Sequence, residues 1–259
     1  MTMLFDTHMH ADYSCDSHMK IQEAVAAAQK AGVGMILTEH WDRDYPTNPE
    51  MFKFDIEDYF AKDGKYRSDR VFLGIEVGMQ PHCAEEDRAM VSRYPFDEVV
   101  GAMHCMYGKD MYEPATYTGL TKEVAVRKYL EESVRCLELY HDFDSYAHLD
   151  YICRYMPYED NNLYYGEHAA LWDRVFKLLI EGNKALEINT RRLEDASVRP
   201  PLLKLYHRFS ELGGTYATLG SDAHYTEHIG RAFAVAENIA DQCGLHIVHF
   251  EKRKMVIDK

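Results

Sequence analysis

Short apolar stretches of this chain end repeatedly in histidines and carboxylates, and this pattern restricts the fold more than any other feature. The endings are Asp6-Thr7-His8-Met9-His10, Thr38-Glu39-His40, Gly74-Ile75-Glu76, Gly101-Ala102-Met103-His104, His148-Leu149-Asp150 and Gly220-Ser221-Asp222-Ala223-His224. Alternate residues of a β-strand share one face, so His8 and His10 can hold one ion between them. The same holds for Asp222 and His224. Because α/β enzymes place their sites at strand ends, the pattern predicts a functional site there.

Strand-like and helix-like segments alternate along the chain. Apolar, β-prone stretches predict strands at 3–8, 34–39, 71–77, 98–104, 145–149, 185–190 and 215–221. Helical spacing predicts helices at 20–31, 121–141, 167–181, 201–212 and 228–242. Residues 41–69 and 106–120 resemble long loops with short helices, and 246–257 a terminal strand or hairpin. The alternation implies parallel pairing through right-handed crossovers. Candidate ligands come from six of the seven strands, which favours a closed or nearly closed barrel.

Length, charge and cysteine usage narrow the class of protein. The 259 residues fit one α/β domain, and the 46% of hydrophobic residues can build a sizeable core. We expect no membrane span, because no apolar run approaches roughly 18 residues, and no signal peptide, because the N-terminus lacks a basic segment followed by an apolar one. The net charge of −14 argues against a nucleic-acid surface, although bound divalent ions would still allow an anionic substrate. Six scattered cysteines favour reduced thiols in the cytoplasm.

Each histidine says little by itself, because a histidine at a strand end is more often a hydrogen-bonded structural residue. The chain has 14 histidines, so some coincidence is expected. No shared structural reason explains why H-x-H, T-E-H, G-x-E, His, H-x-D and S-D-A-H all end strands. We therefore predict a polynuclear metal site without an organic cofactor. The ligand types suit Zn, Mn or Fe and do not distinguish among these metals. The flanking Cys15 and Cys105 are expected to be incidental neighbours.

These motifs resemble the PHP (polymerase and histidinol phosphatase) metallo-phosphoesterase family, most closely its histidinol-phosphatase branch. The resemblance covers nearly the whole chain, with matching stretches at 5–10, 37–40, 73–78, 100–104, 148–151, 186–190 and 220–224. It implies a distorted (β/α)7 barrel. It also implies that residues 1–259 form a single catalytic domain.

The resemblance further implies how three metal ions share their ligands. The first ion would take His8, His10, Glu76 and Asp222, the second Asp16, His40 and His224, and the third His104 and His148, with Glu76 bridging it to the first. Many family members have a histidine at the position of Asp16, and the carboxylate here resembles the phosphatase branch. Asp12 is the competing candidate for that position.

Such a centre can hydrolyse a phosphate ester without a covalent nucleophile. Close metal ions lower the pKa of a bridging water and hold phosphate oxygens, and phosphoryl transfer needs mostly this positioning and electrostatics. We assign the catalytic role to His40, Asp222 and His224, whose ions activate the water. Glu39 and Asp150 are expected to orient histidines. Either could also help to protonate the leaving group, and the sequence identifies no general acid.

Three arginines follow strand ends and are candidates for phosphate binding. Arg154 lies just past the fifth predicted strand, and Arg191 and Arg192 end the sixth, which otherwise supplies no ligand. Guanidinium groups bind phosphate oxygens bidentately. Arginines at similar places form the phosphate clamp in the histidinol-phosphatase branch. Small residues are common there before the basic one, and this chain lacks them, so the choice between Arg191 and Arg192 stays open.

Together these features predict a cytoplasmic enzyme that hydrolyses L-histidinol phosphate to histidinol and phosphate in histidine biosynthesis. Its partner would be this small phosphate ester, with no nucleic acid and no membrane. The alternatives are the same machinery acting on another small phosphate ester, a nucleotide phosphodiester or phosphotyrosine, and a non-enzymatic metal-holding scaffold. Most tyrosines of the expected site loops should pack within them: Tyr45, Tyr107, Tyr117, Tyr155, Tyr158, Tyr164 and Tyr165.

Overall fold

A nine-stranded sheet runs through the molecule, whose computed structural model describes residues 3–259. Residues 1 and 2 of the expected domain lie outside the described residues. The strands are ordered β1 (Phe5–Asp6), β2 (Gly34–Trp41), β3 (Val71–Gly78), β4 (Val99–Ala102), β7 (Ser145–Tyr146), β8 (Ala185–Asn189), β9 (Tyr216–Gly220), β10 (His246–Glu251) and β11 (Lys254–Ile257). All neighbours from β1 to β10 pair in parallel, and only β11 is antiparallel to its partner. The predicted α/β fold with a parallel sheet is therefore confirmed.

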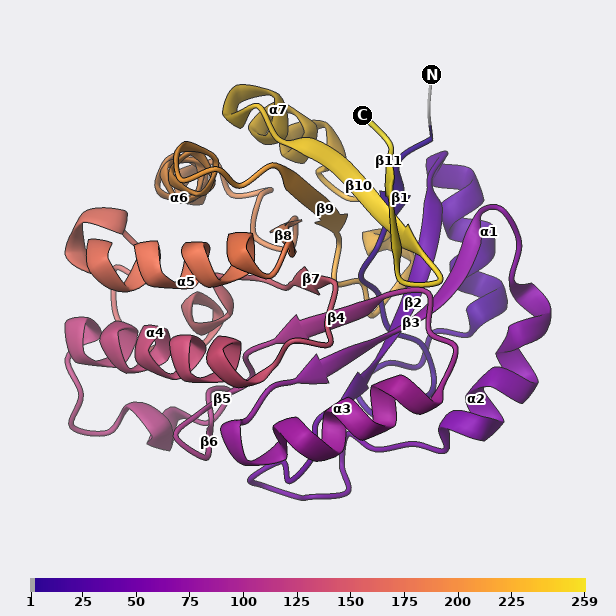
Figure 1. The fold of residues 1–259 in the computed structure, drawn as a ribbon, viewed down its shortest axis with the longest axis horizontal. Coiled ribbons are helices and arrows are strands. Elements are labelled where there is room, and N and C mark those ends of the chain that lie inside the picture. Colours follow the sequence, from indigo (N-terminus) through magenta and orange to yellow (C-terminus); the bar gives the residue numbers. More distant parts are fainter. Residues whose placement is uncertain (1–2) are drawn as a thin grey trace.

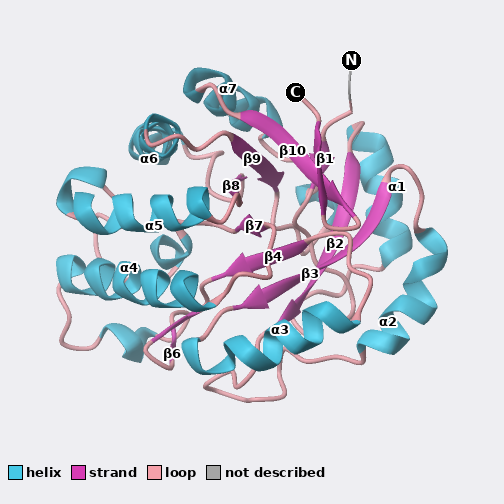
Figure 2. Ribbon diagram, viewed as in Figure 1, coloured by secondary structure: helices cyan, strands magenta, loops and turns pink. Residues whose placement is uncertain are grey.

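Helices surround the sheet on its outside, one after another in chain order (Figures 1 and 2). They are α1 (Ile21–Ala31), α2 (Ile56–Asp63), α3 (Ala84–Arg93), α4 (Lys122–Leu139), α5 (Ala169–Glu181), α6 (Arg199–Glu211) and α7 (Phe233–Cys243). A small ribbon of β5 (Cys105–Met106) and β6 (Lys109–Asp110) follows β4. Among the described residues, no helix combines the length and the apolar character that crossing a membrane would require.

Local signals set several helix boundaries. Gly32 adopts a left-handed conformation with φ of 77°, which ends α1 where the sequence predicted. The Asp55 carboxylate accepts a hydrogen bond from the Asp58 backbone N–H and begins α2. Thr121 caps α4 in the same way. The sequence analysis gave no helix at α3, because only Met90 and Val91 supply buried apolar side chains in its last two turns.

Backbone hydrogen bonds join the segment that follows β1 to the end of β9 and the segment that follows it. Thr7 N–H donates to the Leu219 carbonyl at 2.9 Å, and Asp222 N–H donates to the His8 carbonyl at 2.8 Å. A parallel bridge joins residues 9 and 223. The segments that carry the first and last metal-binding motifs therefore lie side by side.

The hairpin of β10 and β11 lies at the other end of the strands, where β10 pairs with the beginning of β9 on one side and with β11 on the other (Figure 1). The His249 ring stacks on Phe5 with 3.8 Å between ring centroids. The hairpin also reaches the loop before β4, because Arg253 N–H donates to the Asp97 carbonyl at 2.8 Å. The Arg253 guanidinium pairs with Asp144. The predicted terminal hairpin thus covers the amino ends of the strands and leaves their carboxyl ends to the site.

Candidate metal centre

The carboxyl ends of the parallel strands bring together all nine residues that the sequence analysis proposed as ligands. They are His8 and His10 after β1, Asp16 in the following loop, His40 in β2, Glu76 in β3, His104 after β4, His148 after β7, and Asp222 and His224 after β9. Short polar motifs after buried strands produce this arrangement, because parallel strands end at the same edge. All but Asp16 are buried.

Glu76 lies at the middle of the cluster and is fully buried. Its Oε1 atom lies near three imidazoles and its Oε2 near two. The nitrogen–oxygen distances are 2.8 Å to His148, 3.2 Å to His8 and 3.3 Å to His104 from Oε1, and 2.7 Å to His40 and 3.6 Å to His10 from Oε2. Glu76 is therefore placed to touch more than one ion.

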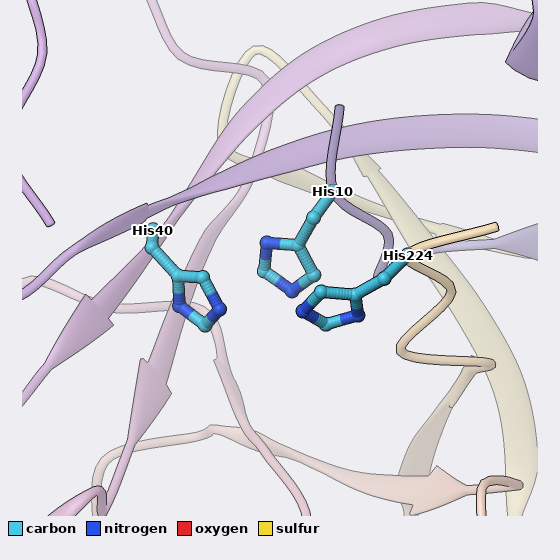
Figure 3. A group of neighbouring side chains, drawn as sticks. All are labelled: His10, His40 and His224. Carbon is cyan, nitrogen blue, oxygen red and sulfur yellow. The ribbon is translucent and has the colours of Figure 1, made fainter. Parts of the chain in front are cut away.

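Three histidines converge on the outer side of this cluster (Figure 3). The His10 ring centroid lies 4.0 Å from that of His40 and 4.4 Å from that of His224, and the three rings point toward one another. Asp16 joins them, with Oδ2 at 3.1 Å from His224 Nε2 and 3.5 Å from His40 Nε2. The competing Asp12 instead pairs with Lys20 Nζ at 2.5 Å. Asp16, rather than Asp12, therefore faces the cluster.

Several buried atoms of the cluster lie close to one another without the geometry of a hydrogen bond: His8 Nε2, His10 Nε2, His40 Nδ1 and Glu76 Oε2. Leaving such groups unsatisfied costs about 1–3 kcal/mol each, which is why natural proteins avoid it. Ligand atoms of three overlapping groups lie within 4.8 Å of one another: His8, His10 and Glu76; His10, His40 and His224; Glu76, His104 and His148. A donor set of imidazoles and carboxylates fits transition-metal ions.

Charge is shared strongly within the cluster. Burial alone would raise the pKa of Glu76, but the neighbouring His8 and His104 imidazoles hold it well below its usual range. Burial would lower the pKa of His40, and the carboxylates of Asp16 and Glu76 raise it well above its usual value instead. His10 is the exception, because burial and the neighbouring histidines lower its pKa. Protons therefore occupy this cluster when no ion does, and a metal ion must displace them.

Two of the three candidate arginines face Asp222, which has a left-handed backbone with φ of 52°. Arg154 Nη1 lies 2.5 Å from Asp222 Oδ2, and Arg191 Nη1 lies 3.3 Å from the same atom. Burial opposes ionisation of Asp222, but these two guanidinium groups hold its pKa well below its usual range. Arg192 instead pairs with Asp150 at 3.0 Å. Asp150 therefore orients an arginine and not a histidine.

Glu39 was expected to orient a histidine, and it contacts His10 only through Ser14. The Glu39 carboxylate accepts the Ser14 hydroxyl at 2.5 Å and the Ala11 backbone N–H at 3.1 Å. Ser14 Oγ in turn lies 3.3 Å from His10 Nδ1. Burial raises the pKa of Glu39 to about 7. Glu39 thus fixes the turn between the first-strand histidines and Asp16.

Two buried carboxylates beside the ligands escaped the sequence analysis. Glu187 Oε1 lies 2.7 Å from His8 Nδ1, and Asp42 Oδ1 lies 2.7 Å from His104 Nδ1. The signal for Asp42 was its spacing, because His40 and Asp42 repeat the alternate-residue pattern of the first strand. Glu187 is a charged residue inside an apolar strand, which is itself unusual.

A cavity of about 440 Å³ opens onto the cluster. His40, His148, Arg154 and Arg191 contribute to its floor, and the rest of its lining includes Tyr45, Phe52, Asp110, Tyr112, Glu113 and Tyr155. Of the seven tyrosines considered in the sequence analysis, Tyr45 and Tyr155 line this cavity. A larger hollow of about 830 Å³ lies against α1, but His224 is the sole proposed ligand in its lining. The smaller cavity therefore suits chemistry at the cluster better.

Comparison with known proteins agrees with this geometry. The PHP domain family model matches residues 6–191. A protein of Clostridium acetobutylicum named "Probable histidinol-phosphatase" is 43% identical over 98% of this chain and 99% of its own length. The histidinol-phosphatase of Lactococcus lactis is 28% identical over 93% of this chain and 91% of its own.

A solved structure is also similar over almost the whole molecule. The crystal structure of histidinol phosphate phosphatase from Lactococcus lactis, complexed with zinc, L-histidinol and phosphate, superposes with a TM-score of 0.92. The two chains are 28% identical, and the match covers 98% of each. The chain described here therefore belongs to the PHP domain family, in its histidinol-phosphatase branch.

Proposed function

We propose that this protein is a metal-dependent phosphomonoesterase that hydrolyses L-histidinol phosphate to L-histidinol and phosphate. The buried cluster of imidazoles and carboxylates beside two arginines, at the floor of one cavity, carries the proposal. The similar Lactococcus enzyme, whose structure holds zinc, L-histidinol and phosphate, supports it. Such a reaction belongs to histidine biosynthesis. Free cysteines at all six positions favour the cytoplasm.

The ligands would divide among three ions as the family resemblance implies. The first ion would be held by His8, His10, Glu76 and Asp222. The second would be held by Asp16, His40 and His224, and the third by His104, His148 and Glu76. The 3.5 Å between His10 Nε2 and Asp222 Oδ1 supports the first set, and the Asp16 contacts support the second. Zinc in the Lactococcus structure supports zinc here, with manganese and iron as alternatives.

The bound ions would supply a water of lowered pKa and positive charge opposite the phosphate. Arg154 would hold phosphate oxygens that face away from the ions, because its side chain is buried and aimed at Asp222. Arg191 is the second phosphate contact in this proposal. Arg192 remains a weaker candidate, since it pairs with Asp150 and does not line the cavity, whereas Arg154 and Arg191 do.

The cavity wall suits a cationic leaving group. Histidinol carries an ammonium group and a basic imidazole, and the wall presents the carboxylates of Asp110 and Glu113 beside aromatic rings. Asp110 is held in place by the Tyr112 backbone N–H at 2.8 Å. Tyr45, which also lines the cavity, hydrogen-bonds to Asp110. An anionic nucleotide would meet these carboxylates unfavourably.

We further propose that the sheet closes as a distorted (β/α)7 barrel forming one catalytic domain. The hydrogen bonds between residues 7–10 and 219–223 support closure at the carboxyl ends of β1 and β9. Strand β10, which pairs with β9, supplies the distortion at the amino ends.

A phosphate-release screen tests the activity directly. Purified, zinc-loaded protein would be given L-histidinol phosphate, tyrosine phosphate and mononucleotides, and we expect the highest kcat/KM for L-histidinol phosphate. Elemental analysis of the gently purified protein should find two to three metal ions per chain. Full activity in rigorously metal-free protein would contradict the metal-dependent mechanism, and a preference for tyrosine phosphate would redirect the substrate assignment.

A further inference from the structure

Glu187 joins three parts of the metal centre although it is not among the ligands. Its Oε1 lies 2.7 Å from His8 Nδ1, and its Oε2 accepts the backbone N–H of His148 at 2.6 Å. Oε2 also accepts the Asn189 side-chain amide at 3.0 Å. Asn189 Oδ1 in turn accepts Arg154 Nη2 at 3.2 Å. One buried carboxylate therefore contacts a ligand of the first ion, a ligand of the third ion and, through Asn189, the phosphate-binding arginine.

Asp42 has the same relation to the other side of the cluster. Its Oδ1 lies 2.7 Å from His104 Nδ1, while His104 Nε2 faces Glu76 at 3.3 Å. Asp42 is almost completely buried, with 2% of its surface exposed. In both pairs the carboxylate binds Nδ1 and leaves Nε2 directed at the cluster.

Both carboxylates lie over a glycine at the end of the neighbouring strand. A Cβ added to Gly220 would overlap Glu187 Oε1 and would come within 2.7 Å of His8 Cβ. A Cβ added to Gly78 would overlap the Asp42 carboxylate in the same way. Neither glycine has a positive φ, so their backbone conformation does not require glycine. Each glycine leaves room for a carboxylate, and this explains why glycine is present at that position.

We propose that Glu187 and Asp42 are positioning residues that fix the tautomer and orientation of His8 and His104, and that Gly220 and Gly78 make the space for them. The proposal rests on the metal centre of the proposed function. Each carboxylate accepts the Nδ1 proton, so the Nε2 lone pair faces the ion. Carboxylates that bind metal-ligating histidines typically raise metal affinity about 10- to 100-fold.

Glutamine in place of Glu187 is a sharp test because its amide cannot satisfy all three neighbours. With its oxygen toward His8, its NH₂ group faces two other donors, the His148 N–H and the Asn189 amide. With its NH₂ toward His8, Nδ1 must become an acceptor, which moves the imidazole proton to Nε2 and removes the lone pair. Either orientation weakens binding of the ion at His8 while the size of the side chain is kept.

Glu98→Gln is the matched control. Glu98 is also a fully buried glutamate of the sheet, but its Oε1 accepts the Ser145 hydroxyl at 2.6 Å and it contacts no proposed ligand. Burial raises the pKa of Glu98 well above its usual range, and the amide keeps the size of the side chain. Gly166→Ala is the control for the glycines, because a Cβ there meets nothing within 4 Å.

The experiment measures zinc affinity by chelator competition and thermal unfolding of the metal-free and zinc-loaded full-length proteins. We expect Glu187→Gln and Asp42→Asn to weaken one zinc site about 10- to 100-fold, with the metal-free Tm close to that of Glu98→Gln. Gly220→Ala should reproduce the loss of zinc, and Gly166→Ala should not.

Zinc affinity equal to that of the Glu98→Gln protein would overturn the proposal. So would a similar fall in Tm of the metal-free and loaded forms without loss of zinc, since that marks a purely structural role. If Glu187→Gln fails to fold, Asp42→Asn decides the matter independently. The measurement needs no substrate, so failure of the L-histidinol phosphate assignment would leave this result unaffected.

Discussion

Buried histidines lie at both ends of the sheet, but their ring nitrogens have different neighbours. At the amino ends, His249 Nδ1 lies 2.6 Å from Asp258 and Nε2 lies 3.3 Å from Glu251, so both nitrogens have partners. At the carboxyl ends, His8 and His10 each keep a buried Nε2 without a hydrogen-bond partner. Burial and nearby carboxylates are common to both regions. An unsatisfied buried Nε2 therefore separates His8 and His10 from the structural His249.

Removing a ligand should have the largest effect and should separate the two regions. We expect His40→Ala and Asp222→Asn to lose several kcal/mol of transition-state stabilisation, or about a thousandfold in kcat, because both would hold ions that activate water. His249→Gln should keep kcat and lower the Tm by about 2 to 10 °C, since it loses buried hydrogen bonds. Steady-state kinetics with metals restored and calorimetry provide the measurements. A near-wild-type kcat in either ligand variant would refute the assignment.

Replacing Arg154 by alanine should affect phosphate binding without affecting the metals. The loss of a charge-assisted contact worth about 1.5–3 kcal/mol should lower kcat/KM about 10- to more than 100-fold. Zinc content should stay the same, because arginine is not a ligand. Rates with L-histidinol phosphate and a generic aryl phosphate decide the role. A uniform loss indicates phosphate binding, a loss confined to L-histidinol phosphate moves Arg154 to the leaving-group pocket, and no loss assigns it a structural role.

The stabilisation that zinc gives should grow with pH. Burial would lower the pKa of His104, but Asp42 and Glu76 raise it to about 9 in the folded protein, above its usual value of about 6.5. Its protonated form therefore stabilises the metal-free fold below pH 6.5, and this stabilisation is lost as the pH rises toward 9. Zinc needs the deprotonated ring.

We therefore expect the Tm difference between zinc-loaded and metal-free protein to widen from pH 6.5 to pH 9. Each displaced proton contributes about 1.4 kcal/mol per pH unit. Parallel thermal scans at several pH values measure the difference. His249→Gln should show the same widening, because His249 binds no ion. A difference that stays constant across this range would contradict proton displacement at the cluster.

The smallest expected effect separates the two adjacent arginines. Arg191→Ala should lower kcat/KM by about tenfold, because its guanidinium lies beside Asp222. Arg192→Ala should change it by less than about threefold, because Arg192 pairs with Asp150 at the side of the site. Kinetics of the two variants under identical metal loading make the comparison. The reverse ranking would make Arg192 the phosphate contact.

Sequence reasoning predicted the strands well and selected ligand candidates that the fold brings together, because both depend on local patterns. All seven predicted strands overlap β1, β2, β3, β4, β7, β8 and β9. The sequence chose Asp16 over Asp12 only through the family resemblance, because both follow the first motif closely; the fold turns Asp16 toward His224. The choice between Arg191 and Arg192 also needed the structure, because neighbouring side chains in a turn point in directions that spacing does not determine.

Glu187 and Asp42 mark the limit of the sequence analysis. Their role depends on which ring nitrogen of a distant histidine they meet, and residues 187 and 8 are far apart in the chain. The sequence also gives no role to Gly220 and Gly78, because the carboxylates for which they make room can be identified only in the structure. Helix α3 was missed for a different reason: its face toward the core is narrow, and Asp87 occupies part of it.

The pairing of residues 7–10 with residues 219–223 has a consequence for synthesis of the protein on the ribosome. His8 and His10 emerge first, and Asp222 and His224 emerge only when most of the chain has been made. A nascent chain that stops before residue 222 lacks proposed ligands of the first and second ions. Full metal loading would therefore come late, after translation has passed the last motif, and a truncated product would differ from the full-length protein in its metal content.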